Sequence, residues 1–258
     1  MTESAAAVDV RALAGRLEHI ESVALLPTVP STNALARRVM HECLENEVPL
    51  PSAVIIALEQ TAGVGRGGRT WSSPAGKGIW ATILHTRDAA QLPLLPLEVA
   101  VAVATLLRDE FGVDARIKWP NDVLVDSAKI AGILIEARAR DSQALVLIGI
   151  GINVFPVGGA ESTSSIEQAS GSHPTLEAAI ARFAAAVDRD LFLAYDPERI
   201  LSRWRELALH RDGDRIAFAL GDERVEGTWE GIDDAGRARV RTADGTRLVA
   251  AGDLIAFT

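Results

Sequence analysis

The stretch AVIIALEQTAGVGRGGRTW, residues 53–71, joins a short apolar run to a loop rich in glycine and arginine. The run at 53–58 has the length and the branched side chains of a buried strand. The loop carries the spacing G-x-G-x-x-G at 63–68, which is typical of dinucleotide-binding proteins. Such a site needs a helix that begins directly after the loop, and RTWSSP at 69–74 is not a helix start. A Rossmann domain is therefore not expected.

The arginines of this loop suggest another kind of site. Arg66 and Arg69 bring fixed positive charge into a segment whose glycines let the backbone close over a ligand. This combination favours a clamp for a carboxylate or a phosphate group. The alternative is a surface turn whose arginines are solvated.

Helix and strand patterns follow each other irregularly on either side of the loop. Ser31 and Thr32 are typical helix-capping residues, and apolar side chains at helical spacing follow them. The other expected elements are strands near 79–83, 115–119, 122–126, 130–137 and 144–153, helices at 97–110, 175–194 and 197–209, and a loop or flap at 156–174. This order favours an α+β domain over a regular βαβ fold.

The pattern changes near Asp212 and Gly213. From there on, short branched or alternating runs are separated by turns that contain glycine and aspartate. That rhythm predicts a small all-β barrel. We therefore expect two domains, residues 1–210 and residues 211–258.

The composition excludes several classes of protein. The chain has 258 residues, 48% of them hydrophobic, which is ample for a packed core. A net charge of -9 argues against non-specific binding of nucleic acid. Cys43 is the single cysteine, so no internal disulfide can form, and the five histidines lack the spacing of zinc ligands. No signal peptide or long apolar span is found, so a cytoplasmic location is expected.

A second polar cluster stands at Lys118-Trp119-Pro120-Asn121-Asp122, between apolar residues on both sides. Polar groups in such surroundings cost free energy unless a partner satisfies them. An amine for a phosphate, an amide for hydrogen bonds and a carboxylate for Mg²⁺ or a proton form a coherent set. The alternative is a tight turn with an exposed lysine.

Glycines mark the two strands that follow. Lys129 precedes Gly132 in one strand, and Gly149, Gly151 and Asn153 end the next. A glycine inside a strand permits close approach of a ligand, and a buried asparagine needs hydrogen-bond partners. A β-bulge is the alternative explanation for Gly149 and Gly151.

In their order along the chain, these segments resemble the biotin protein ligases over residues 28–155, and more weakly beyond. The matching segments are Ser31-Thr32-Asn33, Gln60, the loop from Ala62 to Trp71, Lys118-Trp119-Pro120-Asn121-Asp122, Lys129 before Ala131-Gly132, and Gly149-Ile150-Gly151-Ile152-Asn153. Many members have an arginine where Val64 stands, so the ordering of the loop can differ here. Some members begin with a DNA-binding helix-turn-helix. Only about 27 residues precede Thr28, so we expect a ligase without that domain and without a DNA partner.

The resemblance implies a fold and a reaction. The fold would be α+β, a mixed β-sheet flanked by helices like the catalytic domain of class II aminoacyl-tRNA synthetases, with a small C-terminal SH3-like β-barrel. The enzyme would use ATP and Mg²⁺ to convert biotin to biotinyl-5′-AMP and pyrophosphate. It would then transfer biotin to a lysine of a biotin carboxyl carrier domain and release AMP. Family members of this type are monomers or homodimers.

The resemblance also implies roles for single residues. Catalytic roles would fall to Lys129, Arg66, Arg69 and Asp122, with Asp122 also the candidate Mg²⁺ ligand. Biotin would contact Ser31, Thr32, Asn33, Gln60, Gly63, Arg66, Trp71, Lys129, Gly132 and Gly151. ATP would contact Arg66, Arg69, Trp71, Lys118, Asn121, Asp122, Lys129 and Asn153.

Three other functions are weighed against this one. A lipoate protein ligase would share the general fold, but its Arg-Arg, Gly-Gly-Gly and His-Asp fingerprint is not found. A non-catalytic biotin sensor would bind biotin without releasing pyrophosphate, and the intact Lys129 and Asp122 argue against it. A β-barrel interaction module with an inactive partner domain is the third.

Overall fold

The computed structural model describes residues 9–158, 162–220, 223–250 and 252–257. Its main part is a seven-stranded sheet in the order β1-β2-β3-β7-β6-β5-β4. β1 and β2 are parallel, and every other neighbouring pair is antiparallel. The strands are β1 (Ser22–Leu26), β2 (Ala53–Ala57), β3 (Gly78–Asp88), β4 (Arg116–Lys118), β5 (Asp122–Val125), β6 (Ala128–Arg140) and β7 (Gln143–Asn153). The mixed sheet confirms the predicted α+β class.

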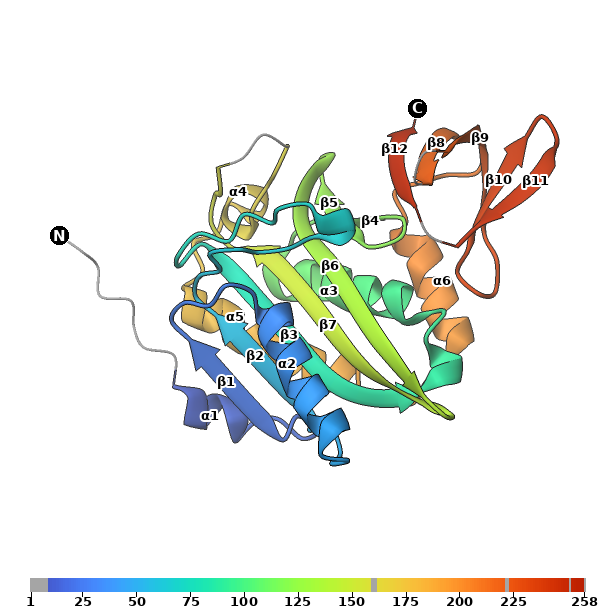
Figure 1. Ribbon diagram of the computed structural model, residues 1–258. Helices are drawn as coiled ribbons and strands as arrows, with labels where there is room; N and C mark the ends of the chain where they lie inside the picture. Colours follow the sequence, from blue (N-terminus) through green and yellow to red (C-terminus); the bar gives the residue numbers. More distant parts are fainter. Residues whose placement is uncertain (1–8, 159–161, 221–222, 251, 258) are drawn as a thin grey trace.

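Helices cover both faces of this sheet, with α2 on one side and α3 and α5 on the other (Figure 1). The described helices are α1 (Val10–Ala14), α2 (Thr32–Glu45), α3 (Leu95–Phe111), α4 (Ile166–Ser170), α5 (Leu176–Asp190) and α6 (Pro197–Leu207), with the 3-10 turns η1 (Arg66–Gly68) and η2 (Ala89–Gln91). Most lie where helical spacing predicts them. The short helix α4 was not expected, because the segment 156–174 has a loop composition.

Alternation along β2 explains why two cores form. Val54 and Ile56 point into the larger core beneath α3 and α5, whereas Ala53 and Ile55 face α2. Successive side chains of a strand point to opposite faces, so a fully apolar strand is buried on both. The apolar run at 53–57 therefore places β2 in the interior of the sheet, where all five of its residues are buried.

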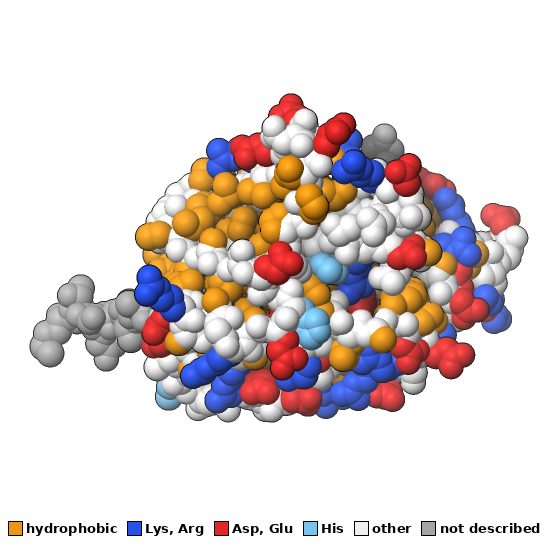
Figure 2. Space-filling view, turned by 90° about the horizontal axis from the view of Figure 1, so that it is seen from below, with side chains coloured by type: hydrophobic (Ala, Val, Ile, Leu, Met, Phe, Trp, Pro, Cys, Tyr) orange, Lys and Arg blue, Asp and Glu red, His pale blue; other side chains and the backbone are white. Residues whose placement is uncertain are grey.

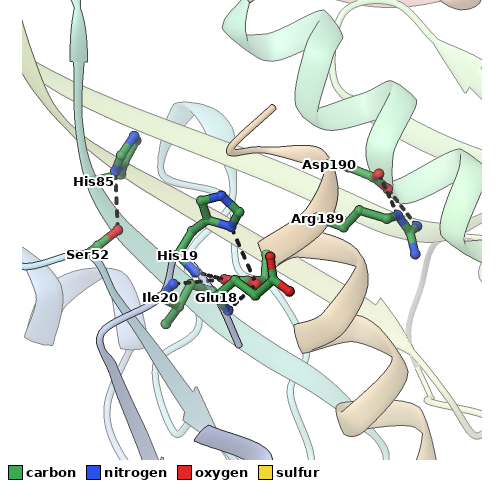
Figure 3. Close-up of polar contacts among 8 residues, drawn as sticks. Glu18, His19, Ile20, Ser52, His85, Arg189 and Asp190 are labelled. Atoms are coloured by element: carbon green, nitrogen blue, oxygen red, sulfur yellow. Dashed lines mark hydrogen bonds and ion pairs between the residues drawn. The ribbon is translucent and has the colours of Figure 1, made fainter. Parts of the chain in front are cut away.

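The chain before β1 is tied to α5 by one carboxylate. Asp188 accepts hydrogen bonds from the backbone N–H groups of Glu18, His19 and Ile20 at 2.7–2.9 Å (Figure 3). Burial opposes ionisation of this carboxyl, but the three backbone bonds outweigh it and hold its pKa below the usual value. Close by, His85 Nδ1 lies 3.3 Å from Ser52 Oγ, and burial lowers the His85 pKa to about 4.

The C-terminal part is a five-stranded antiparallel sheet in the order β11-β10-β9-β8-β12. Its strands are β8 (Arg215–Leu220), β9 (Glu223–Ile232), β10 (Ala238–Thr242), β11 (Gly245–Val249) and β12 (Asp253–Phe257). They lie beside β4 and α6 (Figure 1). The predicted small β domain is confirmed. Its boundary at residue 211 stays a prediction, since one core cluster contains residues from both parts, including Trp204 and Trp229.

The surface seen from below has an apolar area on the left and mixed charges along its lower edge (Figure 2). Lys and Arg side chains stand among Asp and Glu side chains there, so the net charge of -9 forms no single acidic patch on this edge. In the described part of the chain, no helix is long and apolar enough to cross a membrane.

Candidate active site

One cavity of about 260 Å³ gathers nearly all the residues that the sequence nominated. Its walls come from the start of α2, from the loop between β2 and β3, and from β5, β6 and β7. The nominated residues that line it are Ser31, Thr32, Asn33, Gln60, Arg66, Arg69, Trp71, Lys118, Asn121, Asp122, Lys129, Gly132 and Gly151. The sequence also nominated Gly63 and Asn153, and these two residues are absent from the described lining.

One end of the cavity is built on the first residues of α2. Ser31 caps the helix, and its hydroxyl oxygen accepts from Ala34 N at 3.4 Å. The backbone N–H of Thr32 donates to Gln60 Oε1 at 2.8 Å, and Gln60 Nε2 donates to Ser73 Oγ at 2.9 Å. Ser31, Thr32 and the neighbouring Asn33 are each about 95% buried. This end therefore offers ordered hydroxyl and amide groups in a dry setting, which suits a neutral polar ligand group.

The other end carries charge. Lys129 Nζ lies 2.8 Å from Asp122 Oδ1 and 5.1 Å from the centre of the Trp71 ring. Both charged side chains keep about a fifth of their surface exposed, at 21% and 24%. Their pairing supplies an ammonium group and a carboxylate side by side at the cavity wall, together with Lys118. Such a set can bind an anion and can move or hold a proton.

The arginine loop bridges this end to the C-terminal part. Arg66 Nη1 donates to Asn121 Oδ1 at 2.8 Å, and Arg66 Nη2 donates to Gly252 O at 3.2 Å. Gly67 and Gly68 have φ of 64° and 75°, a conformation that only glycine adopts without strain. The loop thus holds one guanidinium against two other segments, and Arg69 Nε donates back to Arg66 O at 3.1 Å. For Arg66 this arrangement disfavours the surface-turn alternative, whereas Arg69 is exposed.

The glycines of β6 and β7 make room for an indole ring. Gly132 and Gly151 are register partners, and the pairing of β7 with β3 and β6 is regular on both sides of Gly149 and Gly151. A Cβ atom at Gly151 would lie 2.5 Å from Trp71 Nε1, and one at Gly132 would lie 2.9 Å from the Trp71 ring. These contacts explain Gly132 and Gly151, and a Cβ atom at Gly149 would lie 2.2 Å from Asn33 Oδ1, so no β-bulge is needed for Gly149 or Gly151.

Gly63 and Asn153 lie outside the cavity lining and support residues that belong to it. Asn153 is 1% exposed, and its Nδ2 donates to Ser164 O at 3.0 Å. Ser164 N in turn donates to Lys129 O at 3.0 Å, so Asn153 supports the backbone of Lys129 from a distance. A Cβ atom at Gly63 would lie 2.4 Å from Trp71 O. Gly63 is thus needed for packing of the loop.

The segment Lys118-Trp119-Pro120-Asn121-Asp122 is no exposed turn, because Trp119 anchors it. The Trp119 side chain is 2% exposed, its Nε1 donates to Gly236 O at 3.0 Å, and its ring stands edge-on to Phe218. Its backbone N–H donates to His210 Nε2 at 3.1 Å. Burial lowers the His210 pKa to about 4, so the ring is neutral and can accept that bond at neutral pH.

Sequence reasoning missed three residues that support the polar end. Thr82 is fully buried in β3, and its hydroxyl lies 2.6 Å from Asn33 Oδ1. Glu136 accepts from Asn33 Nδ2 at 3.0 Å and pairs with Arg37. The only signal for Thr82 was a threonine inside an apolar strand. Nothing in the sequence around Arg37 or Glu136 marks either residue as part of a site.

A metal ion would find one carboxylate in this cavity. Asp122 is the only acidic residue in its described lining. No group of three or more His, Cys, Asp or Glu side chains suited to a metal gathers elsewhere among the described residues. Mg²⁺ is usually held by one or two carboxylates together with phosphate oxygens and water. The residues present fit such an ion only as a partner of a bound phosphate.

Comparisons with known proteins identify the family. Residues 25–153 match the model of the biotin/lipoate A/B protein ligase family, and residues 213–255 match the biotin protein ligase C-terminal domain. The bifunctional ligase/repressor BirA of Bacillus spizizenii is 32% identical over 235 residues, which cover 84% of this chain and 70% of that protein. The biotin–[acetyl-CoA-carboxylase] ligase of Paracoccus denitrificans is 31% identical over 79% of this chain and 90% of its own length.

A solved structure has the same fold. The biotin protein ligase from Aquifex aeolicus, in complex with biotin and ATP, superposes with a TM-score of 0.72 at 22% identity. The match covers 92% of this chain and 99% of that one. From its matching sequence models, its relatives and its fold, we conclude that this chain belongs to the biotin/lipoate A/B protein ligase family and, within it, to the biotin protein ligases.

Proposed function

We propose that this biotin protein ligase couples biotin to a carrier protein in two steps inside the cavity described above. In the first, a biotin carboxylate oxygen attacks the α-phosphorus of ATP, which forms biotinyl-5′-AMP and releases pyrophosphate. In the second, the side-chain amine of a carrier lysine attacks the biotinyl carbonyl, and AMP leaves. The observation that carries the proposal is the Lys129–Asp122 pair beside an ordered, neutral hydrogen-bonding pocket.

The first step brings two anions together. A carboxylate and a triphosphate repel each other unless fixed positive charge lies between them. Lys129, at 2.8 Å from Asp122, would contact both the carboxylate and the α-phosphate. Arg66, Arg69 and Lys118 line the same cavity and would neutralise the phosphates. These cations lie on a preformed wall, so little reorganisation accompanies the reaction.

The neutral end of the cavity would hold the ureido ring of biotin. Ser31, Thr32 and Gln60 present hydroxyl and amide groups there, and Asn33 lines the same wall. Trp71 would add apolar surface beside Gly132 and Gly151. A small number of ordered polar groups in a mostly buried pocket sets the orientation of a ligand. Biotin would therefore lie with its carboxylate toward Lys129.

Asp122 would have two roles. It would hold Mg²⁺ together with phosphate oxygens of ATP, and the ion would offset charge on the phosphates. In the second step the attacking amine must be neutral, although a free lysine has a pKa of about 10.4. Asp122 would orient that amine or accept its proton, because it supplies the carboxylate in the described lining of the cavity.

The acceptor would be the lysine-bearing domain of a biotin-dependent carboxylase. The biotin–[acetyl-CoA-carboxylase] ligase of Paracoccus denitrificans supports this choice through its name and 31% identity. The cytoplasmic location and the monomeric or homodimeric state stay predictions from the sequence.

Pyrophosphate release from ATP tests the first step. Purified protein with ATP and Mg²⁺ should release pyrophosphate when biotin is added and not when lipoate replaces it. Lipoate is the informative control, because the matched family contains ligases for both acids. Saturable biotin binding without pyrophosphate release would instead indicate a sensor. Release with lipoate alone would overturn the choice of substrate.

A further inference from the structure

A chain of hydrogen bonds runs from the protein surface to the neutral end of the cavity. It begins with Arg37, whose guanidinium makes two hydrogen bonds of 2.8 Å to the carboxylate of Glu136. Glu136 Oε1 accepts from Asn33 Nδ2 at 3.0 Å, and Asn33 Oδ1 lies 2.6 Å from the hydroxyl of Thr82. That hydroxyl lies 2.8 Å from Thr32 Oγ1. Arg37 and Glu136 lie outside the cavity lining, whereas Thr32 and Asn33 form part of it.

The charge on Glu136 sets the direction of each bond in this chain. An ionised carboxylate only accepts hydrogen bonds, so the amide nitrogen of Asn33 must face it. The amide oxygen of Asn33 then faces Thr82, and it too can only accept. The single hydroxyl proton of Thr82 is therefore directed to Asn33 and is withheld from Thr32.

Glu136 is kept ionised by its neighbours. Burial opposes its ionisation, but the hydrogen bonds from Arg37 and Asn33 outweigh burial and hold the Glu136 pKa below its ordinary value. Its side chain is 28% exposed, so water can also solvate the charge. The carboxylate is thus a stable acceptor at neutral pH.

The other side of Thr32 is also fixed. Gln60 Nε2 donates to Ser73 Oγ at 2.9 Å, which turns Gln60 Oε1 toward Thr32. The Thr32 hydroxyl lies 3.1 Å from Gln60 Oε1 and 2.8 Å from the Thr82 hydroxyl, and it can donate its one proton to either when the Thr82 proton is directed to Asn33. With the Thr82 proton directed to Asn33, no hydrogen bond found among the described residues delivers a proton to Thr32 Oγ1. Both lone pairs of that oxygen are therefore available as acceptors.

We infer that Glu136, ion-paired with Arg37, is a positioning residue that makes the Thr32 hydroxyl an acceptor for a ureido N–H of biotin. The inference rests on the proposed function and adds a specificity determinant outside the cavity. A neutral residue at position 136 would let Asn33 rotate, so that its nitrogen faces Thr82. Thr82 could then donate to Thr32 and occupy one of the two lone pairs of its oxygen, and the Thr32 proton would no longer be directed to Thr82.

The test is a double-mutant cycle on biotin affinity, measured by titration calorimetry on the full chain without ATP. The variants are Glu136→Gln, Thr82→Val and the double variant. We expect Glu136→Gln to weaken biotin binding about tenfold, the size of one lost hydrogen bond, while ATP affinity stays within about twofold. In the Thr82→Val background, Glu136→Gln should add little, because the relay, the chain of hydrogen bonds from Glu136 through Asn33 and Thr82 to Thr32, is already broken. A matched control is Glu230→Gln, another arginine-paired glutamate that lies in the C-terminal sheet.

Each other outcome decides against part of the scheme. Unchanged biotin affinity in Glu136→Gln, or equal effects of that substitution in the wild-type and Thr82→Val backgrounds, would overturn the relay while leaving the proposed function intact. Equal losses of biotin and ATP affinity with a lower melting temperature would show that Glu136 has a structural role only, and this result would also overturn the relay. Absence of biotin binding by the wild-type protein would overturn the proposed function, and the relay with it.

Discussion

Lys129 Nζ and Asp122 Oδ1 lie 2.8 Å apart, on two strands joined through one antiparallel ladder. Leu124, two residues after Asp122, is the register partner of Lys129, so strand pairing brings the two charges to the same end of the cavity. In the proposed first step Lys129 would contact both anions, and removing its ammonium group would remove that positive charge. Lys129→Ala should lower biotin-dependent pyrophosphate release at least about a hundredfold.

The fold should survive that substitution, because the Lys129 side chain is partly exposed at 21%. Circular dichroism and the melting temperature should stay close to those of the wild type. Lys77→Ala is the matched control, since Lys77 lies outside the cavity lining and is one of three lysines in the chain. An unimpaired Lys129→Ala would remove Lys129 from the mechanism without changing the family.

Arg66→Lys tests the bridge made by the arginine loop. A lysine keeps the charge but cannot donate in two directions from a planar group to Asn121 Oδ1 and Gly252 O. We expect a fall of about tenfold or more in kcat/KM for ATP in the pyrophosphate assay. Arg203→Lys, at an exposed pair with Glu206, serves as control and should behave like the wild type. Normal kinetics in Arg66→Lys would mean that charge alone suffices.

Gly151→Ala tests why the strand carries glycine. Its new Cβ atom would lie 2.5 Å from Trp71 Nε1, so the indole must move away from β7. The KM for biotin should rise about tenfold or more, and tryptophan fluorescence should change. Gly158→Ala is the control, because nothing lies within 4 Å of its Cβ position. An unchanged biotin KM in the Gly151→Ala variant would show that the position of Trp71 does not shape the pocket.

Two buried tryptophans allow a matched comparison of stability. Trp119 Nε1 donates to Gly236 O at 3.0 Å, whereas no hydrogen-bond partner is found for Trp80 Nε1 among the described residues. Both side chains are almost fully buried, at 2% and 1% exposure. Trp119→Phe should therefore lower the free energy of unfolding by about 1–2 kcal/mol more than Trp80→Phe does. Urea denaturation measures the free energy of unfolding of both variants. Equal losses would show that the hydrogen bond to Gly236 O makes no net contribution to stability.

His210 predicts a pH dependence of stability. Its pKa is about 4 in the folded protein, because of burial, and about 6.5 when the chain is unfolded. Since the folded pKa is depressed, the unfolded chain binds the proton more readily as pH falls below about 6.5. The contribution of His210 to the free energy of unfolding is therefore fully present above pH 6.5. It is lost progressively between pH 6.5 and 4, and the loss amounts to about 3 kcal/mol.

A His210→Gln variant checks this origin. Glutamine offers an amide oxygen to the Trp119 N–H but does not titrate. The free energy of unfolding should then fall less steeply between pH 6.5 and 4 than in the wild type. His173→Gln, at an exposed position, should leave the slope nearly unchanged. Identical slopes for His210→Gln and the wild type would assign the acid sensitivity to other groups, such as His85.

Much of this protein could be predicted from local patterns. The cap at Ser31, the apolar run of β2 and the order of the motifs depend on residues close together in the chain, whose spacing decides helix or strand. The family resemblance rests on the same short segments, and the comparisons confirm it. Local patterns failed to predict α4, because the five helical residues lie in a segment with the composition of a loop.

Only the tertiary structure decided which of these segments meet. Strand order sets β6 beside β7, and α2 packs over β3 and β7, so groups more than a hundred residues apart, such as Asn33 and Glu136, share a hydrogen bond. The same packing sets Asn153 behind the cavity wall and seats Trp119 against Gly236. Spacing along the chain carries no information on these contacts, because they depend on how sheets and helices bury their apolar faces against one another.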